Sequence, residues 1–213
     1  MNQNDTATEN SGPLSPAWTL LIAGLVLPLL CGLVFFWPER TIANVDDLFF
    51  VPWAMEFAET GRHWNPLLAV QFPGLETYHL QPRLHLIFAG WFFTAAGSSA
   101  ATLVLYEFLC YALTSLAFVV LCLRLNLRLA ALFTPLVFAP AYVVAGFRLE
   151  LTGALLFTLG FLLSLPLLRP EGDAGAARSI LGKLFFALAP LAAPAVFAWS
   201  LGAIAVIELS RLA

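Results

Sequence analysis

The chain has 213 residues, of which 61% are hydrophobic and only 11% are charged, whereas a soluble domain carries about 25% charged residues. This deficit and the long apolar runs exclude an ordinary water-soluble domain and predict an integral membrane protein. The net charge of −3 is too small to indicate a nucleic-acid partner, so membrane lipids are the first expected partners.

The apolar runs are continuous and do not alternate in polarity, which favours transmembrane helices over the strands of a barrel. We therefore expect an all-α polytopic bundle of about six spans. Residues 1–15 are polar and lack Lys and Arg, so we expect a disordered tail there and a single transmembrane domain over residues 16–213. Because a secretory signal needs a positive start, the first apolar run, Ala17–Trp37, is predicted to be an uncleaved span.

A polar segment, residues 38–83, follows this first span. Within it, Asp46 and Asp47 precede the run LFFVPWAMEFAE, which predicts a helix lying along the membrane surface, with Asp46 as its N-cap and Gly61 at its end. The aromatic residues of this helix either dip into the interface or pack against neighbouring spans: Phe49, Phe50, Trp53 and Phe57. All histidines of the chain lie in or next to the segment: His63, His79 and His85.

Further apolar runs predict the remaining spans. These are Leu84–Ala96, Ala101–Leu123, two spans within residues 129–168 that are divided at Gly146–Glu150, and Leu184–Ile207. Residues 124–128 and 169–183 are the predicted polar connectors. The three cysteines, Cys31, Cys110 and Cys122, lie inside apolar runs and are expected to be small buried side chains without a disulfide or metal.

The order of motifs in the first half of the chain resembles the membrane glycosyltransferases of the GT-C class. The resemblance is to the dolichyl- or polyprenyl-phosphate-dependent mannosyltransferase and aminoarabinose-transferase type, and it covers about residues 15–168. An Asp-Glu pair opens the first extracytoplasmic loop of those enzymes, and this chain has Asp46-Asp47 there. Further similar segments are Gly61-Arg62-His63-Trp64-Asn65-Pro66, Gln81-Pro82-Arg83-Leu84 and Gly146-Phe147-Arg148-Leu149-Glu150. Asp47, Gln81 and Arg83 depart from the family pattern, and the chain is short for the family.

The resemblance implies transfer of a sugar from a polyprenyl-phosphate donor to a lipid, glycan or protein acceptor, with inversion at the sugar carbon. It implies that Asp46 is the base and that Asp47 assists by hydrogen bonding or by holding a divalent cation. Arginines suit the donor phosphate because a guanidinium binds phosphate bidentately. The candidate substrate-binding residues are Arg62, His63, Trp64, Arg83, His85, Arg148 and Glu150.

Each of these residues also has a purely structural interpretation. An Asp-Asp pair before an apolar run is a common helix start, and Arg83 can be an interfacial arginine that snorkels. Arg148 and Glu150 can pair with each other, and the histidines have no known metal-ligand spacing, although with Asp47 or Glu76 they can assemble a site. Glu107 is isolated within an apolar run and is expected to face the bundle interior.

The resemblance places loop 38–83 outside the cytoplasm, in a multi-pass protein of the plasma or inner membrane. With six spans, residues 124–128 and 169–183 would lie on the same side, and these three segments carry most of the Lys and Arg residues. The positive-inside rule favours the opposite orientation, so the two arguments conflict.

Two other functions are compatible with the sequence. The chain can be a non-catalytic or truncated membrane subunit that works with partner membrane subunits, as its shortness and the altered Gln81-Pro82-Arg83 suggest. It can also be a small transporter with Glu107, Arg148 and Glu150 along its path, although no inverted repeat supports this.

Overall fold

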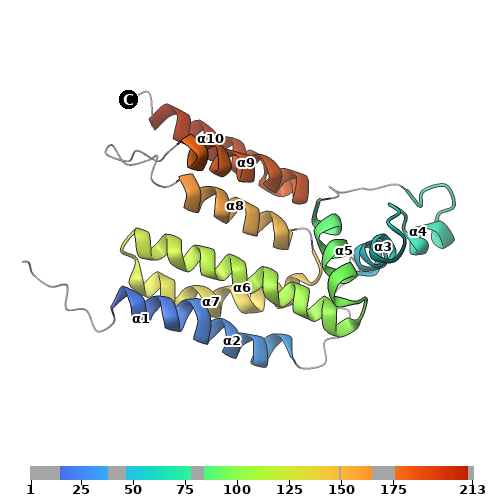
Figure 1. The fold of residues 1–213 in the computed structure, drawn as a ribbon, viewed down its shortest axis with the longest axis horizontal. Coiled ribbons are helices and arrows are strands. Elements are labelled where there is room, and N and C mark those ends of the chain that lie inside the picture. Colours follow the sequence, from blue (N-terminus) through green and yellow to red (C-terminus); the bar gives the residue numbers. More distant parts are fainter. Residues whose placement is uncertain (1–14, 38–46, 78–83, 149, 165–175, 211–213) are drawn as a thin grey trace, which may run out of the picture.

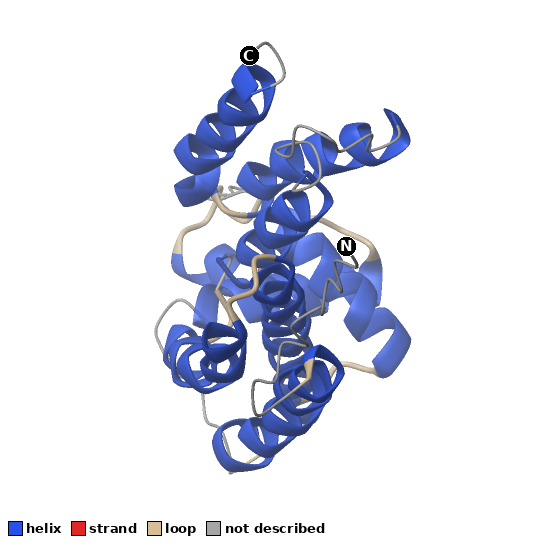
Figure 2. Cartoon of the chain, turned by 90° about the vertical axis from the view of Figure 1, so that its left-hand side faces the viewer, coloured by secondary structure: helices blue, strands red, loops and turns tan. Residues whose placement is uncertain are grey.

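The computed structural model describes residues 15–37, 47–77, 84–148, 150–164 and 176–210. This part of the chain is almost entirely helical and contains no β-strand, which confirms the predicted all-α class for it (Figure 2). Three helical segments are long and apolar enough to cross a membrane, judged by length and composition: Pro16–Phe36, α6 (Ala100–Arg124) and α7 (Arg128–Ala145).

The first of these segments alternates between α-helical and wider π-helical turns. It is built from α1 (Pro16–Leu21), η1 (Ile22–Val26), α2 (Leu27–Cys31) and η2 (Gly32–Phe36). Ser15 caps it by accepting a hydrogen bond from the Trp18 N–H over 3.3 Å, and Pro16 takes the first helical position. Pro28 lies in α2, directly after a π turn, where the missing N–H and the bulk of the proline ring disturb regular α-helical bonding.

The long helices run back and forth along one axis together with α8 (Glu150–Ser164), α9 (Ala176–Ala192) and α10 (Phe197–Ser210) (Figure 1). Side-chain contacts agree with this alternation, in which α6 and α8 run in the same direction and α9 and α10 run in opposite directions. The Arg124 guanidinium at the end of α6 donates to the Leu162 carbonyl near the end of α8, over 3.3 Å. Lys183, early in α9, forms an ion pair with Glu208, late in α10.

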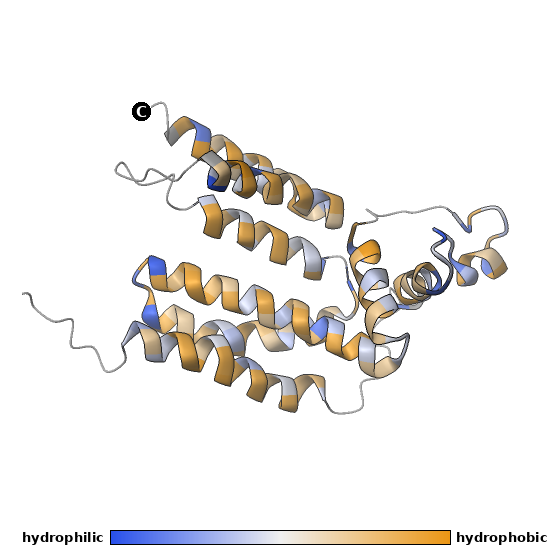
Figure 3. Ribbon diagram, in the orientation of Figure 1, coloured by the Kyte–Doolittle hydropathy of each residue, from blue (hydrophilic) through white to orange (hydrophobic). Residues whose placement is uncertain are grey.

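The bundle therefore has two distinct ends (Figure 1). The polar-loop end holds α3 (Asp47–Thr60), α4 (Pro66–Gln71), α5 (Leu84–Ala96) and the turn at residues 146–148. The connector end holds the start of α1, the turn at residues 125–127 and the start of α9. Apolar residues cover most of the length between the two ends (Figure 3).

Helix α5 has the bounds predicted for the second span, but it runs across the ends of the long helices instead of alongside them (Figure 1). Its 13 residues give a length of about 20 Å at the α-helical rise, which is shorter than the roughly 30 Å of a bilayer core. The chain therefore enters and leaves α5 at the same end of the bundle. This corrects the predicted order of crossings, and it moves residues 124–128 to the end opposite α3.

The C-terminal part also differs from prediction. Part of the predicted connector 169–183 is helical, since α9 already begins at Ala176, and the predicted single span Leu184–Ile207 is interrupted. Ala193 is extended (φ −147°, ψ 108°) and a short 3-10 turn, Pro194–Val196, leads into α10. A proline disfavours the helical conformation of the residue before it and cannot donate a backbone hydrogen bond, so the helix stops there.

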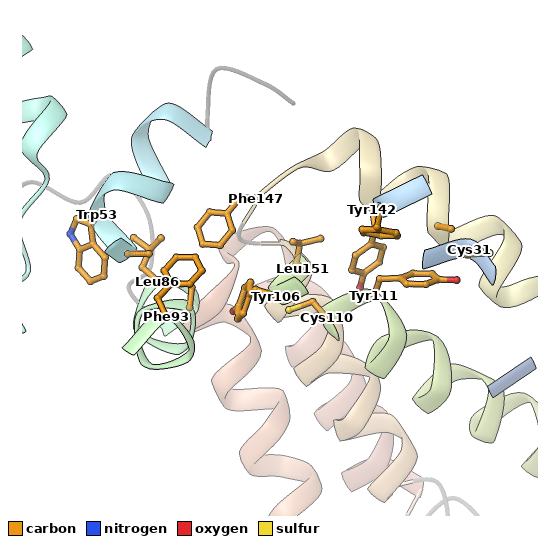
Figure 4. Close-up of a cluster of buried hydrophobic side chains, with 14 residues drawn as sticks. Cys31, Trp53, Leu86, Phe93, Tyr106, Cys110, Tyr111, Tyr142, Phe147 and Leu151 are labelled. Carbon is orange, nitrogen blue, oxygen red and sulfur yellow. The ribbon is translucent and has the colours of Figure 1, made fainter. Parts of the chain in front are cut away.

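The largest buried cluster lies towards the polar-loop end and joins α3 to the bundle (Figure 4). Its aromatic side chains form a row from Trp53 in α3 through Phe93 and Tyr106 to Tyr111 and Tyr142. Trp53 is 1% exposed and belongs to the same buried cluster as Leu86 and Phe93 of α5. Of the two interpretations of these aromatics, packing against neighbouring helices is therefore the correct one for Trp53.

The three cysteines, Cys31, Cys110 and Cys122, are buried, as predicted. None of them is in a disulfide. They are small apolar side chains of the core, and Cys31 Sγ lies 3.8 Å from the Pro135 carbonyl oxygen in the neighbouring α7.

Candidate functional site

The site begins where α3 begins, at Asp47. This residue is 3% exposed, and its Oδ1 accepts a hydrogen bond from the Phe147 N–H over 2.8 Å. A carboxylate is favoured at this position because the first turn of a helix carries unpaired N–H groups and a partial positive charge. The bond joins the surface helix to the turn between α7 and α8, 100 residues further along the chain. Asp46, the predicted base, precedes the described part of this segment.

The turn that donates this hydrogen bond to Asp47 has a well-defined backbone conformation. Gly146 ends α7 with φ 73° and ψ −155°, a conformation that residues with a Cβ avoid. The Gly146 carbonyl accepts from the Arg148 N–H over 2.9 Å, and the Arg148 carbonyl accepts from the Leu151 N–H over 3.2 Å. Phe147 is fully buried, and its ring centroid lies 5.7 Å from that of Tyr106.

Arg148 and Glu150 form an ion pair with 3.4 Å between Nε and Oε2. Their side chains are 42% and 48% exposed, so both remain accessible from outside the bundle. The pairing agrees with one of the two interpretations made from the sequence. Because Arg148 directly follows Phe147, its backbone is held relative to the start of α3, and an acidic and a guanidinium group share this end of the bundle.

His85 lies in the core, not at the surface. Its side chain is fully buried, and Nδ1 lies 2.8 Å from Thr152 Oγ1, which is also 3.1 Å from the Tyr106 hydroxyl. These three side chains come from α5, α8 and α6 and tie the transverse helix to the bundle. His85 Nε2 has no hydrogen-bond partner among the described residues. The structure thus places His85, a predicted substrate-binding residue, in the core, where it contacts α6 and α8.

The motif that follows α3 folds back onto α3. Gly61 has φ 70° and ends the helix, Arg62 is exposed, and Trp64 is half-buried. The His63 ring lies 5.1 Å from the Trp53 ring and 5.0 Å from the Phe57 ring. These contacts keep His63 beside α3 and away from His85, which packs on Tyr106 and Thr152.

Asn65 and the helix that it starts were not predicted from the sequence. Asn65 is buried, and its Oδ1 accepts from the Leu67 and Leu68 N–H groups over 3.0 and 3.2 Å, which caps α4. Its amide also donates to the Phe49 carbonyl over 2.7 Å, which fixes α4 against α3. Asn followed by Pro is a signal for a helix start, and Asn65-Pro66 could have been recognised as one.

Other candidates are not brought together in the described ranges. Arg83 and His79 lie outside those ranges. No three His, Cys, Asp or Glu side chains within the described segments lie close enough to hold a metal ion. Glu107 is 2% exposed in α6, which fits the expectation that it faces the interior.

Charge is distributed unequally between the two ends of the bundle. The described charged residues of the polar-loop end are mostly acidic: Asp47, Glu56, Glu59, Glu76 and Glu150, with Arg62 and Arg148. Those of the connector end are mostly basic: Arg124, Arg128, Arg178 and Lys183, with Glu208. Residues 124–128 lie at the end opposite the polar loop in this fold, because α5 does not carry the chain between the ends.

Comparison of the chain with protein-family models, with curated protein sequences and with solved structures gives no match.

Proposed function

We propose that this chain is a membrane glycosyltransferase that moves a sugar from a polyprenyl-phosphate donor to a lipid, glycan or protein acceptor. One observation carries the proposal: Asp47 contacts the turn of Arg148, so the acidic start of α3 and an accessible arginine meet at one end of an apolar bundle. Transfer from a lipid phosphate needs a base for the acceptor and a cation for the departing phosphate. A carboxylate and a guanidinium at the membrane surface supply these two groups.

The reaction would use the residues as follows. The Asp46 carboxylate takes the proton of the acceptor hydroxyl as that oxygen bonds to the anomeric carbon of the sugar. The bond between this carbon and the phosphate oxygen breaks, and polyprenyl phosphate leaves with the electron pair. Arg148 compensates the negative charge on the leaving phosphate, with Arg62 and Arg83 as further candidates. The attack on the face opposite the leaving group inverts the configuration at the sugar carbon.

The charge distribution supports an orientation in the membrane. The connector end, with Arg124, Arg128, Arg178 and Lys183, fits the cytoplasmic side. The polar-loop end then lies outside the cytoplasm, in the plasma or inner membrane, as the resemblance also implies. The positive-inside rule and the resemblance then predict the same orientation. We assign the crossings to Pro16–Phe36, α6, α7, α8, α9 and α10, of which the last three are short and require local thinning of the bilayer.

The test is turnover by the purified chain in liposomes that contain a membrane lipid extract as acceptor. The donors are synthetic polyprenyl-phosphate mannose and polyprenyl-phosphate aminoarabinose, and the measurement is release of polyprenyl phosphate. We expect Asp46→Asn to lower the rate by about 100-fold or more, because the amide cannot take a proton. The matched control is Glu59→Gln, an exposed carboxylate at the other end of α3, which should leave the rate unchanged.

Two results would contradict the proposal. Turnover by Asp46→Asn at the wild-type rate would exclude Asp46 as the base. Absence of release by the wild-type chain with both donors would favour the non-catalytic membrane subunit instead.

A further inference from the structure

The side chain of Asp47 is directed into the protein. It is 3% exposed and bound to the Phe147 N–H, so it does not face a substrate. We propose that Asp47 is a positioning residue that acts through Arg148, which binds the phosphate of the lipid donor. The inference rests on the proposed function, because it needs a phosphate-bearing donor.

The Phe147 N–H is the point at which the turn is attached to α3. Within the turn, the neighbouring backbone groups are already paired: the Arg148 N–H with the Gly146 carbonyl, and the Leu151 N–H with the Arg148 carbonyl. The Phe147 N–H instead donates to the Asp47 carboxylate, which belongs to α3 and lies outside the turn. A buried N–H requires a partner, so loss of this acceptor forces the turn to move or to open to water.

The Phe147 ring provides a second attachment, to the bundle. It is fully buried, and its centroid lies 4.7 Å from that of the His85 ring. The centroids of the Phe93 and Tyr106 rings lie 6.2 Å and 5.7 Å from it (Figure 4). Phe147 is thus held by its backbone on α3 and by its ring on α5 and α6. Arg148 follows at once and leaves the core with a side chain that is 42% exposed.

This arrangement gives Arg148 a defined position at the surface of the bundle. A guanidinium binds phosphate best in a fixed bidentate geometry, and an arginine on a mobile turn loses that advantage. Glu150 contacts the guanidinium through Nε at 3.4 Å, which orients the side chain from the other side of the turn. Asp47 therefore affects phosphate binding without touching the phosphate.

The experiment measures binding of polyprenyl phosphate to the full chain in lipid nanodiscs. We expect Arg148→Ala to weaken binding by about tenfold or more. Asp47→Ala should weaken it by a similar factor, and the double variant should bind no more weakly than Arg148→Ala alone. Asp47→Asn should stay within about threefold of wild type, because the amide oxygen can accept the same hydrogen bond. Asp47→Glu should be worse than Asp47→Asn, because the acceptor is displaced by one methylene.

Hydrogen exchange of the Phe147 amide gives a readout that does not depend on a ligand. We expect faster exchange in Asp47→Ala and in Asp47→Glu than in wild type or Asp47→Asn. If Asp47→Ala is not recovered as folded protein, the comparison of Asp47→Asn with Asp47→Glu decides the point. If the negative charge of Asp47 were required instead, Asp47→Glu would bind polyprenyl phosphate more tightly than Asp47→Asn.

The outcomes separate the two proposals. Additive losses in the double variant, or equal losses in Asp47→Asn and Asp47→Ala, would overturn a role through Arg148. Wild-type protein that does not bind polyprenyl phosphate would overturn both the proposed function and the phosphate role of Arg148. Unchanged amide exchange in Asp47→Ala would overturn the positioning role while leaving the proposed function standing.

Discussion

The two ends of the bundle are held together in different ways. At the polar-loop end, buried side chains bond across elements, as Asp47 does to Phe147 and His85 does to Thr152. At the connector end, a small apolar cluster that includes Val119, Cys122 and Ala131 is buried, and the side-chain bonds between helices come from charged residues. Arg124 is exposed and donates to the Leu162 carbonyl, and Lys183 pairs with Glu208 with both side chains partly exposed.

This difference fits the tasks proposed for the two ends. A reaction needs groups held within fractions of an ångström, and buried bonds across elements provide that precision. The connector end needs only charged side chains that reach water and lipid headgroups, which flexible Arg and Lys side chains supply. We therefore expect changes at the polar-loop end to cost more than changes at the connector end.

The largest expected effect is a difference in sidedness, because opposite ends of a membrane bundle face different compartments. The native cysteines are replaced, single cysteines are placed at Thr60 and at Leu127, and intact cells are treated with a membrane-impermeant thiol reagent. We expect Thr60→Cys to be labelled from outside and Leu127→Cys to be labelled only after permeabilisation, because the two residues lie at opposite ends.

The two positions test different statements. Labelling of both cysteines from the same side would mean that α5 crosses the membrane and would contradict the comparison of the ends. Labelling of Leu127→Cys alone from outside would preserve the fold but reverse the orientation, and the proposed extracytoplasmic site would lose its support.

Much of the helical structure was predictable because apolar runs and turn residues are local signals. The bounds of α5, the division at Gly146–Glu150 and the start of the surface helix at Asp47 all match the sequence analysis closely. The direction of α5 was not predictable, because 13 apolar residues suit both a buried transverse helix and a short crossing. Pro194 was a visible signal for the break before α10, but Pro190 lies inside α9, and sequence alone does not distinguish the two.

The candidate site was predictable only as a set of residue types. The sequence indicated Asp47 and Arg148, but the 2.8 Å bond from Phe147 to Asp47 depends on packing between segments 100 residues apart. The core position of His85 likewise depends on Thr152 and Tyr106, which no motif connects with it. Long-range pairing of this kind leaves no local periodicity in a sequence.

The next largest effect should come from filling the contact between α3 and α5. A Cβ on Gly90 would overlap the Phe57 ring and lie 3.2 Å from the Ala54 carbonyl oxygen. We expect Gly90→Val to lower the free energy of unfolding in detergent by about 1–3 kcal/mol through overpacking. The matched control is Gly202→Val in α10, where an added Cβ meets nothing within 4 Å. Equal thermal midpoints for the two variants would show that α3 is not packed tightly on α5.

A smaller loss should follow from removing the hydroxyl that joins three helices. Thr152→Val takes away the partner of His85 Nδ1 and of the Tyr106 hydroxyl, which we expect to cost about 1–2 kcal/mol. Thr158→Val is the control on the same helix, because its hydroxyl bonds only to the Ala154 carbonyl one turn away. Thermal unfolding in detergent measures both variants, and an equal shift would mean that the three-helix junction adds no stability.

The smallest effect belongs to the connector end. Lys183 and Glu208 are 33% and 45% exposed, and an ion pair at this exposure contributes about 0–1 kcal/mol. We expect Lys183→Met, which keeps the length of the side chain, to shift the thermal midpoint less than Thr152→Val does. Any shift should shrink as salt is added, because exposed charges are screened. A shift larger than that of Thr152→Val would reverse the comparison, and the connector end would then be the one that holds the α9–α10 hairpin, and with it the bundle, together.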